Sequence, residues 1–257
     1  MPTNHAILSA SSSHRWLECP PSAKLCAELP DTSSEYAQEG TDAHTLCEHR
    51  LKALLGRETT DPTENLTYYN EEMERCAVEY ATYAYEQVKK AKVACNDPIV
   101  LIEQKLDFSR WVPEGFGTGD CVIVADGTLS VIDFKYGKGV EVLAENNPQM
   151  MLYAFGALEL FDGIYDISAV NMIIFQPRRD NISEYAISKE ELLRWANEIL
   201  TPTAQLAANG DGDFKAGKHC RFCKVRATCR KLAEYNLALA RYDFEPPATC
   251  LLYTSPS

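Results

Sequence analysis

The sequence predicts an α/β fold in which a central mixed β-sheet is flanked by helices. The chain has 257 residues, of which 46% are hydrophobic and 24% are charged. This length and composition suit an ordinary globular protein with one well-buried domain and a small appendage. Two long helical patterns come first, strand patterns follow, and helices and strands then alternate. That order favours a mixed sheet covered by helices.

The N-terminal third of the chain is expected to be helical. A short helix is predicted over residues 9–19, because its serines can cap it and Pro20-Pro21 stops it. The segment 35–55 carries apolar residues at helical spacing and predicts a long helix. A second long helix is expected over 70–93, which is rich in Glu, Ala and Tyr.

Strand patterns begin near residue 99. Asp126-Gly127 lies between two short β-branched runs and is a strong hairpin signal. Further along, Pro148 suits the first turn of a helix, and Ser188 with Glu191 can form a capping box. The expected strands are 99–106, 120–125, 129–135, 169–175 and 184–187, and the expected helices are 148–161 and 188–206.

Charge is distributed unevenly along the chain. The net charge of -12 by itself argues against a nucleic-acid partner, because contacts to phosphates need Lys and Arg. The segment Phe214–Lys231, however, holds seven basic residues and no acidic ones. An acidic protein with one such segment can still bind DNA there. The seven are Lys215, Lys218, Arg221, Lys224, Arg226, Arg230 and Lys231.

Nothing in the sequence indicates a membrane protein. No apolar run approaches the roughly 20 residues that span a bilayer. The N-terminal stretch MPTNHAILSASSS lacks the basic region and the long apolar core of a secretory signal. We therefore expect a cytoplasmic protein without a membrane partner.

The Asp126-Gly127 turn makes a geometric prediction about two carboxylates. A two-residue turn there fixes the register of the flanking strands, and counting outward sets Asp120 opposite Asp133. Directly opposed residues have Cβ atoms roughly 4.5–5.5 Å apart. Two carboxylates at that distance repel each other unless a cation lies between them. Lys135 follows Asp133 by two positions and points to the same face.

The strands that carry these residues are apolar on both faces, as in a central strand pair of a covered sheet. Charged side chains at the end of such a pair are hard to explain as solvated surface. A metal bound by the two acids can polarise a phosphate and activate water, with the lysine placed for the nucleophile or the developing charge. The alternative is an exposed hairpin end with incidental charges. Glu103, on the preceding strand, is given little weight as a further ligand.

Two motifs here resemble a known nuclease superfamily. Gly117–Asp120 followed by Val131–Lys135 resembles the G-x-x-D…(D/E)-x-K core of the PD-(D/E)XK nucleases, whose fold is restriction-endonuclease-like. The resemblance is closer to the RecB-like exonuclease branch. In that branch a histidine on an N-terminal helix joins the metal site, and Glu39–His44 is similar to that motif. A Q-x-x-x-Y helix also follows the lysine strand, and Gln149–Tyr153 fits it at a spacing that shares one helix face.

The resemblance implies a role for each matching residue. Mg²⁺ or Mn²⁺ would be held by Asp120, Asp133 and His44, with the Phe134 carbonyl assisting. Lys135 would be catalytic. The helix residues Gln149 and Tyr153 would contact DNA or orient the lysine. Taken without the resemblance, His44 also suits a surface or core position, and the two helix residues suit simple packing.

Ten cysteines are many for a cytoplasmic protein, where structural disulfides are rare. Cys220, Cys223 and Cys229 lie close together in the basic segment, and Cys19 stands far upstream. Thiolates grouped in this way favour zinc or an iron–sulfur cluster, and the spacing does not separate the two. His219 in place of Cys19 is a further alternative.

Trp16-x2-Cys19-Pro20 resembles the N-terminal cysteine motif of iron–sulfur RecB-like nucleases of the AddB and CRISPR-adaptation types. In those proteins one cysteine before the nuclease core and three after it hold a [4Fe–4S] cluster. The resemblance therefore implies a structural cluster that joins the N- and C-terminal segments and sets the basic segment beside the DNA path. The DNA contacts implied there are Lys218, Arg221, Lys224 and Arg226.

These inferences together predict one nuclease domain over residues 1–240, with 1–30 and 214–231 forming the cluster region. The tail 241–257 has no recognisable pattern and is expected to be disordered, truncated or non-native.

The expected function is a metal-dependent DNA nuclease, an exonuclease in phage DNA processing, recombination or repair, with recombination or replication proteins as partners. Two other functions stay open: a catalytically inactive DNA-binding or assembly protein that keeps the fold, and a zinc-stabilised interaction module.

Overall fold

Five strands form one mixed sheet at the centre of the structure, a computed structural model that describes residues 6–30 and 34–244. The strands lie in chain order, and every neighbouring pair is antiparallel except β3 and β4. Helix α5 (Pro148–Phe161) makes the crossover between those two parallel strands. The strands are β1 (Ile99–Asp107), β2 (Phe116–Ala125), β3 (Gly127–Phe134), β4 (Ile167–Gln176) and β5 (Asn181–Ser188).

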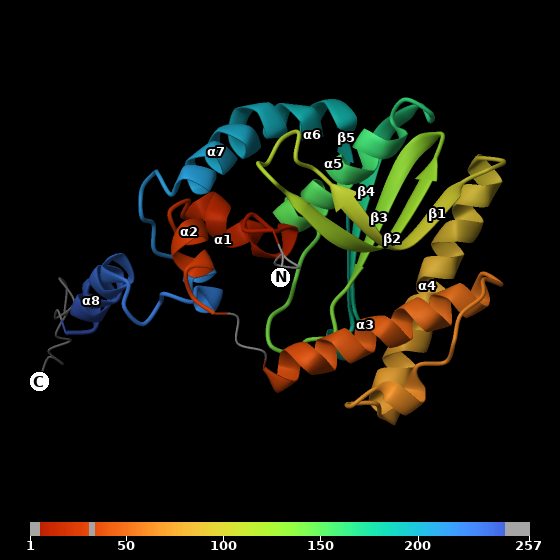
Figure 1. Ribbon diagram of the computed structural model, residues 1–257, viewed down its shortest axis with the longest axis horizontal. Helices are drawn as coiled ribbons and strands as arrows, with labels where there is room; N and C mark the ends of the chain where they lie inside the picture. Colours follow the sequence, from red (N-terminus) through yellow and green to blue (C-terminus); the bar gives the residue numbers. More distant parts are fainter. Residues whose placement is uncertain (1–5, 31–33, 245–257) are drawn as a thin grey trace, which may run out of the picture.

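Helices cover both faces of this sheet (Figure 1). Before the first strand come η1 (Ala10–Ser12), α1 (Ser13–Glu18), α2 (Ser22–Ala27), α3 (Glu35–Leu54), η2 (Thr63–Asn65) and α4 (Glu71–Ala94). After it, besides α5, come η3 (Pro177–Arg179), α6 (Lys189–Trp195), the π-helical turn η4 (Ala196–Leu200), α7 (Thr201–Asn209), η5 (Lys218–Phe222) and α8 (Arg230–Phe244). The predicted α/β fold class, with a mixed sheet flanked by helices, is confirmed.

Side-chain caps fix where the long helices begin. The side chain of Ser34 accepts the Ala37 N–H at the start of α3, and that of Asn70 accepts the Met73 N–H at the start of α4. The predicted capping box of Ser188 and Glu191 is present at the start of α6.

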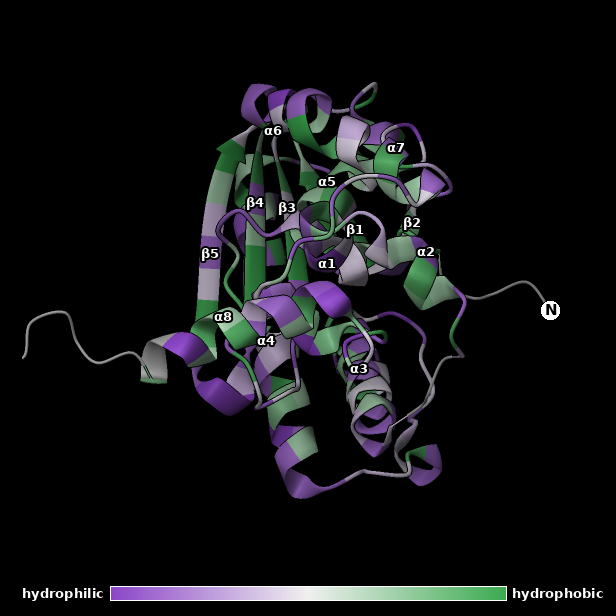
Figure 2. Ribbon diagram, turned by 90° about the vertical axis from the view of Figure 1, so that its left-hand side faces the viewer, coloured by the Kyte–Doolittle hydropathy of each residue, from purple (hydrophilic) through white to green (hydrophobic). Residues whose placement is uncertain are grey.

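The alternation of side chains along the central strands produces two separate cores. Leu129 and Val131 of β3 point into the core on the α5 side, which α1, α2, α6 and α7 extend. Ile132 and Phe134 point into the core beneath α3 and α4. Figure 2 shows β3 and β4 hydrophobic along most of their length, with hydrophilic residues gathered on the outer helices. The prediction that the hairpin strands β2 and β3 are apolar on both faces is confirmed, because each contributes side chains to both cores.

Helix α5 lies unusually close to the edge strand β1. A Cβ atom added at Gly156 would lie 2.7 Å from Leu106 Cβ and 3.1 Å from the Leu106 carbonyl carbon. Both neighbours are fixed by the sheet, so neither can move away freely. The glycine is therefore needed for the helix to rest on the sheet.

We predict that Gly156→Ala lowers the free energy of unfolding by about 1–3 kcal/mol, the usual cost of overpacking a core. Alanine's better helix propensity offsets only part of this loss. Gly163→Ala is the matched control, because nothing lies within 4 Å of its added Cβ. Chemical denaturation of both variants measures the effect, and equal midpoints would contradict the proposed close approach.

Near each end of the chain the structure has a helix that the sequence analysis did not predict. A second short helix, α2, follows Pro20-Pro21, where only a stop was expected. Helix α8 was not predicted, and it crosses the expected domain boundary at residue 240. Most of the predicted tail, residues 245–257, lies outside the described residues. Within the described part of the chain, no helix is both long enough and apolar enough to cross a membrane.

The N-terminal helices meet the C-terminal cysteine-rich segment. Helix α1 contacts η5, and in Figure 1 the polypeptide then continues from η5 to α8 at the far side from α3 and α4. Cys19, at the end of α1, lines one small cavity together with Cys220, Cys223 and Cys229. The two segments thus lie side by side at these cysteines, and the metal cluster expected to join them stays a prediction.

Candidate functional site

Asp120 is fixed at the point where β2 and β3 separate. The ladder between these strands has the predicted register from Ala125↔Thr128 to Cys121↔Ile132, and Asp120 and Asp133 are the next residues outward. The Phe134 N–H donates to Oδ2 of Asp120 at 2.6 Å, so the carboxylate takes a backbone donor at the end of the ladder. Its other oxygen, Oδ1, lies 3.1 Å from Nδ1 of His44 on α3.

Glu103 joins this pair from strand β1. Its Oε1 lies 4.0 Å from Nδ1 of His44, and one ligand atom from each of Glu103, His44 and Asp120 lies within 4.8 Å of the others. Glu103 has a φ of 49°, a left-handed conformation that a residue other than glycine seldom adopts. Such strain occurs at functional sites more often than elsewhere. One imidazole and two carboxylates are suitable ligands for Mn²⁺ or Mg²⁺.

Asp133 belongs to a second group of side chains beside the first. Its Oδ2 lies 2.8 Å from Nζ of Lys135, and its Oδ1 accepts a hydrogen bond of 3.2 Å from Nε2 of Gln149. Lys135 in turn donates to Oε1 of Gln149 at 3.1 Å, and Gln149 donates to the Tyr153 hydroxyl at 3.0 Å. Helix α5 therefore holds the lysine in place through one glutamine, and Asp133 is 98% buried at the centre of the group.

The electrostatics of the two carboxylates differ. Burial alone would raise the pKa of Asp120, but the charge and hydrogen bond of His44 and the Phe134 N–H lower it below its usual range. Burial raises the pKa of Asp133, although Lys135 opposes this. Burial also raises the pKa of Glu103 to about 7, with the charge of Asp120 adding to the effect. In the metal-free protein Asp120 thus stays ionised. The raised pKa values of Asp133 and Glu103 mean that ionising either of these carboxyl groups beside Asp120 is unfavourable.

His44 is held protonated by this arrangement. Burial lowers its pKa, but the charge and hydrogen bond of Asp120 more than compensate and raise it to about 9. A folded-state pKa above the ordinary value of 6.5 means that the pair stabilises the fold fully below pH 6.5. That stabilisation is lost as the pH rises through about 9.

We therefore predict that His44→Gln destabilises the metal-free protein more at pH 6 than at pH 10. The measurement is the thermal midpoint of wild type and variant in EDTA at both pH values. His14→Gln, an exposed histidine on α1, is the control and should show no such difference. If the thermal midpoint of His44→Gln lies below that of wild type by the same amount at both pH values, the ion pair between His44 and Asp120 is contradicted.

The cysteines expected to bind a metal line the same cavity, but their sulfur atoms are spread out. No three of the four sulfur atoms lie within 4.8 Å of one another, all four residues being described. A tetrahedral zinc with Zn–S bonds near 2.3 Å would bring them to about 3.8 Å. Their donor chemistry suits iron or zinc, but as they lie in the structure the four sulfur atoms do not form the ligand set of one tetrahedral ion.

Two further side chains that could bind a metal lie beside these four cysteines. Cys26 of α2, which the sequence motifs do not include, has its Sγ 3.8 Å from Sγ of Cys223. His219 is buried, and its Nε2 lies 2.8 Å from the Lys215 carbonyl oxygen and so donates to it. The alternative ligand set with His219 in place of Cys19 would have to use the remaining Nδ1 of this ring.

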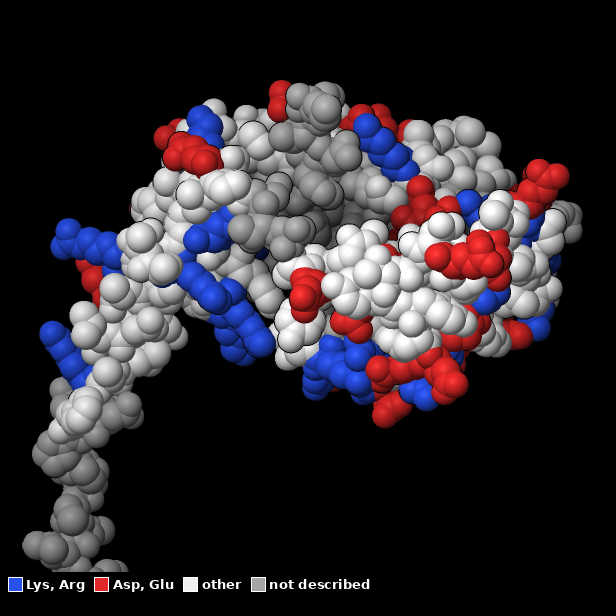
Figure 3. Space-filling view, turned by 60° about the horizontal axis from the view of Figure 1, so that its bottom comes forward, with Lys and Arg blue, Asp and Glu red and all other residues white. Residues whose placement is uncertain are grey.

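The basic residues predicted to contact DNA lie away from the carboxylates, around a larger cavity of about 1230 Å³. Figure 3 shows Lys and Arg gathered on the side of the molecule from which α8 extends, whereas Asp and Glu are mixed with Lys and Arg over the rest of this face. Lys218, Arg221, Lys224 and Arg226 all line this cavity.

The structure thus brings together all the predicted catalytic side chains, namely His44, Asp120, Asp133 and Lys135, with Gln149 and Tyr153. Their roles, and that of the Phe134 carbonyl, stay predictions. The main difference lies in the metal ligands: the convergent group contains Glu103, while Asp133 pairs with Lys135. The register could have indicated Glu103, because it continues the β1–β2 pairing directly opposite Asp120.

Two solved structures are weakly similar to the chain. A protein from Eubacterium rectale, provisionally named an exonuclease, is 12% identical, with 97% of this chain and 93% of that chain covered and a TM-score of 0.45. A protein called SSO0001 is 14% identical, with 72% of this chain and 95% of that chain covered and a TM-score of 0.29. Likenesses this weak do not bear on the activity of the chain.

A protein-family model gives a much more extensive match. It covers residues 5–254, nearly the entire chain, and its description is "Protein of unknown function (DUF2800)". The chain therefore belongs to the DUF2800 family.

Proposed function

We propose that the protein is a divalent-metal-dependent DNA nuclease, with exonuclease action on DNA ends. The observation that carries this proposal is the convergence of His44, Glu103 and Asp120 next to the fixed pair Asp133 and Lys135. An imidazole, three carboxylates and a lysine at the end of a central hairpin are the groups that metal-assisted phosphodiester hydrolysis requires. Their order along the chain also resembles that of RecB-like nucleases.

The donor set fits Mn²⁺ or Mg²⁺. Asp120 and Glu103 offer carboxylate oxygens and His44 offers a ring nitrogen, with Asp133 alongside. When bound, the metal would act as a Lewis acid on the phosphate and lower the pKa of a bound water. Because protonated His44 cannot act as a ligand, metal binding would release its proton, and affinity would rise with pH.

The protein's own side chains would then orient and stabilise the reacting groups. The Phe134 N–H and His44 hold the Asp120 carboxylate in one orientation. Gln149 holds Lys135, whose ammonium group is kept protonated by Asp133 although burial opposes this. A fixed positive charge at this place would stabilise the negative charge that develops on the phosphate during attack. Tyr153 supports Gln149 from the next turn of α5.

Activity on end-labelled DNA tests the proposal. Purified protein is incubated with single-stranded and double-stranded substrates in Mn²⁺, in Mg²⁺ and in EDTA. We expect loss of the labelled end with metal and none in EDTA. The absence of degradation with either metal would contradict nuclease function and favour an inactive DNA-binding protein.

We also propose that Cys19, Cys220, Cys223 and Cys229 hold a [4Fe–4S] cluster with a structural role. The single cavity that all four line supports this, and so does the resemblance of their order to that in iron–sulfur RecB-like nucleases. Iron and sulfide analysis of anaerobically purified protein tests it. Stoichiometric zinc without iron would overturn the cluster and favour a zinc-stabilised module.

The proposed biological setting is phage DNA processing, recombination or repair, in a cytoplasm where replication or recombination proteins are the expected partners. The resemblance of the motif order to that of RecB-like nucleases supports this setting.

A further inference from the structure

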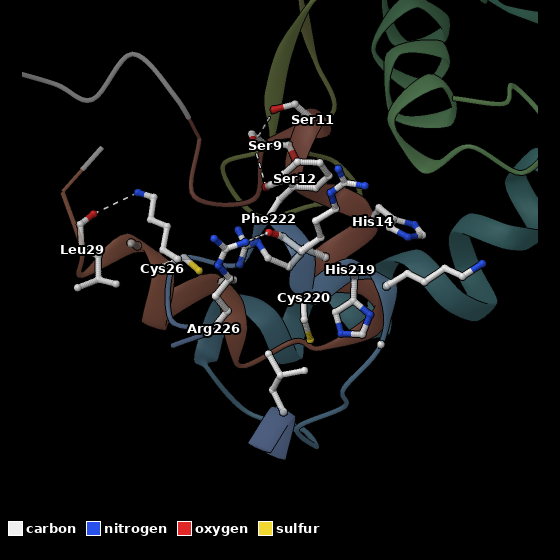
Figure 4. A pocket seen from close by; sticks show the side chains of 18 of the residues that line it. Ser9, Ser11, Ser12, His14, Cys26, Leu29, His219, Cys220, Phe222 and Arg226 are labelled. Carbon is white, nitrogen blue, oxygen red and sulfur yellow. Dashed lines mark hydrogen bonds between the residues drawn. The ribbon is translucent and has the colours of Figure 1, made fainter. Parts of the chain in front are cut away.

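The larger cavity has two walls that are far apart in the sequence. One wall comes from the N-terminal helices and the residues before them, with Ser9, Ser12 and Arg15. The other comes from the cysteine-rich segment and α8, with Arg221, Phe222 and other residues. Figure 4 shows the serines across the cavity from Arg226 and Cys220. At about 1230 Å³ the space exceeds the roughly 300–1,000 Å³ of a usual small-molecule site, so it suits an extended ligand.

The lining of this cavity is cationic and contains no Asp or Glu among its described residues, in a chain whose net charge is -12. Four of its cations have no carboxylate within ion-pair distance in the described part of the chain: Arg15, Lys218, Arg221 and Arg226. A guanidinium group has five N–H donors. Arg226 uses one on the Arg221 carbonyl, which leaves others for a ligand. Such a lining favours a polyanion.

Hydroxyl groups complement the cations. Ser9 and Ser12 have their Oγ atoms 2.9 Å apart, and Ser11 lies beside them on the same wall. Together with Arg and Lys, serine hydroxyls are common ligands of the phosphates in nucleic acids. The mixture of hydroxyls and guanidinium groups on facing walls matches a sugar–phosphate chain better than a single compact anion.

An aromatic ring indicates which form of nucleic acid fits. Phe222 lines the cavity with 75% of its surface exposed, and the Arg221 guanidinium lies 5.6 Å from its ring centroid. Exposed aromatic side chains beside basic ones bind unpaired bases by stacking, regardless of sequence. The bases of a duplex are already stacked and paired, so they do not offer their faces to such a ring.

The wall of the cavity that carries the serines packs against the candidate active site. Ala10, which lies between these serines in the sequence, packs closely against Gly117. A Cβ atom added to Gly117 would lie 3.3 Å from Cβ of Ala10 and 2.8 Å from the Tyr153 ring. Tyr153 contacts Gln149, which holds Lys135. From the other side, Val140 lines the cavity five residues after that lysine. The cavity and the carboxylates therefore belong to neighbouring parts of the structure.

From these observations we infer that the cavity binds single-stranded DNA, as the substrate of the neighbouring carboxylate site. Arg221 and Arg226 would contact phosphates, and Phe222 would stack on a base. The role of the bound strand as a substrate rests on the proposed nuclease function. The inference specifies that substrate as DNA with an unpaired end. The binding itself does not depend on catalysis.

Fluorescence anisotropy of full-length, anaerobically purified protein tests the inference, in EDTA so that no cleavage occurs. The probes are a labelled oligothymidylate and a labelled blunt-ended hairpin duplex. We expect at least tenfold tighter binding of the oligothymidylate, and a loss of at least tenfold in Phe222→Ala and in Arg221→Ala. Phe222→Trp should retain binding. Tyr36→Ala, which removes an equally exposed aromatic ring from α3, should bind like wild type.

Three results would overturn the inference: equal affinity for both probes, wild-type binding by Phe222→Ala and Arg221→Ala, or an equal loss in Tyr36→Ala. Matching thermal midpoints of all variants exclude misfolding as the cause of a loss. Protein that binds the oligothymidylate through Phe222 but degrades no DNA in Mn²⁺ would refute the proposed nuclease function and leave the single-strand site standing.

Discussion

Replacing Asp120 with asparagine is expected to abolish Mn²⁺ binding at the carboxylate site and metal-dependent DNA cleavage together. Asp120 is the one carboxylate that touches both His44 and the end of the β2–β3 ladder, through its two different oxygens. Asparagine keeps the size of the side chain but removes the negative charge that a divalent cation needs. Because a metal supplies several kcal/mol of transition-state stabilisation, we expect the cleavage rate to fall by about 10³-fold or more.

Asp166→Asn is the matched control for this variant. Asp166 is an exposed aspartate in the turn before β4, away from the site, and its replacement should leave both measurements unchanged. Mn²⁺ binding followed by electron paramagnetic resonance and single-turnover cleavage give the two readouts. If Asp120→Asn binds Mn²⁺ and cleaves DNA like wild type, then the carboxylate group is not the metal site.

Replacing Cys220 with alanine is expected to remove the cluster and to destabilise the protein strongly. The proposed cluster joins Cys19 to Cys220, Cys223 and Cys229, and so closes a loop that contains nearly the entire domain. Cross-links that close loops of more than 100 residues stabilise proteins by about 4 kcal/mol. For a chain of this size that corresponds to a fall of about 10 °C in the thermal midpoint.

Two other cysteine variants make this prediction specific. Cys95→Ala removes a buried cysteine outside the cluster region and should keep its full iron content. Cys26→Ala tests the neighbour that the structure places 3.8 Å from Cys223. We expect it to retain iron as well, because Cys19 completes the set of four. Loss of iron from Cys26→Ala, with iron kept in Cys19→Ala, would assign the fourth position to Cys26 instead.

Much of the site geometry could be predicted because it depends on a local feature. Asp126-Gly127 fixes a two-residue turn, the turn fixes the register, and the register carries Asp120 and Asp133 to the same end of the hairpin. Helix α5 was equally predictable, since its start depends on Pro148 and its spacing sets Gln149 and Tyr153 on one face. In each case a few neighbouring residues decide the outcome.

Features that depend on distant parts of the chain were harder to predict. The ligand role suggested for Glu103 depends on its left-handed backbone and on His44 reaching it from helix α3. The contact between Cys26 and Cys223 joins two segments at opposite ends of the chain. The β1–β2 register indicates that Glu103 lies opposite Asp120, but no local pattern encodes its backbone conformation or the contact between the two cysteines. Helix α8 is a different case, because its Leu, Ala and Arg residues favour a helix and the prediction overlooked them.

The most direct test of the nuclease proposal is the single-turnover rate of DNA cleavage by Lys135→Met at saturating Mn²⁺. The variant removes the charge that Gln149 and Asp133 hold in place, and methionine keeps a similar length. We predict a fall of about 10²–10³-fold, the usual effect of losing one group that stabilises charge in the transition state, with Mn²⁺ binding unchanged. Lys89→Met, on the exposed face of α4, should cleave like wild type. A Lys135→Met rate equal to that of wild type would contradict a catalytic centre at this hairpin.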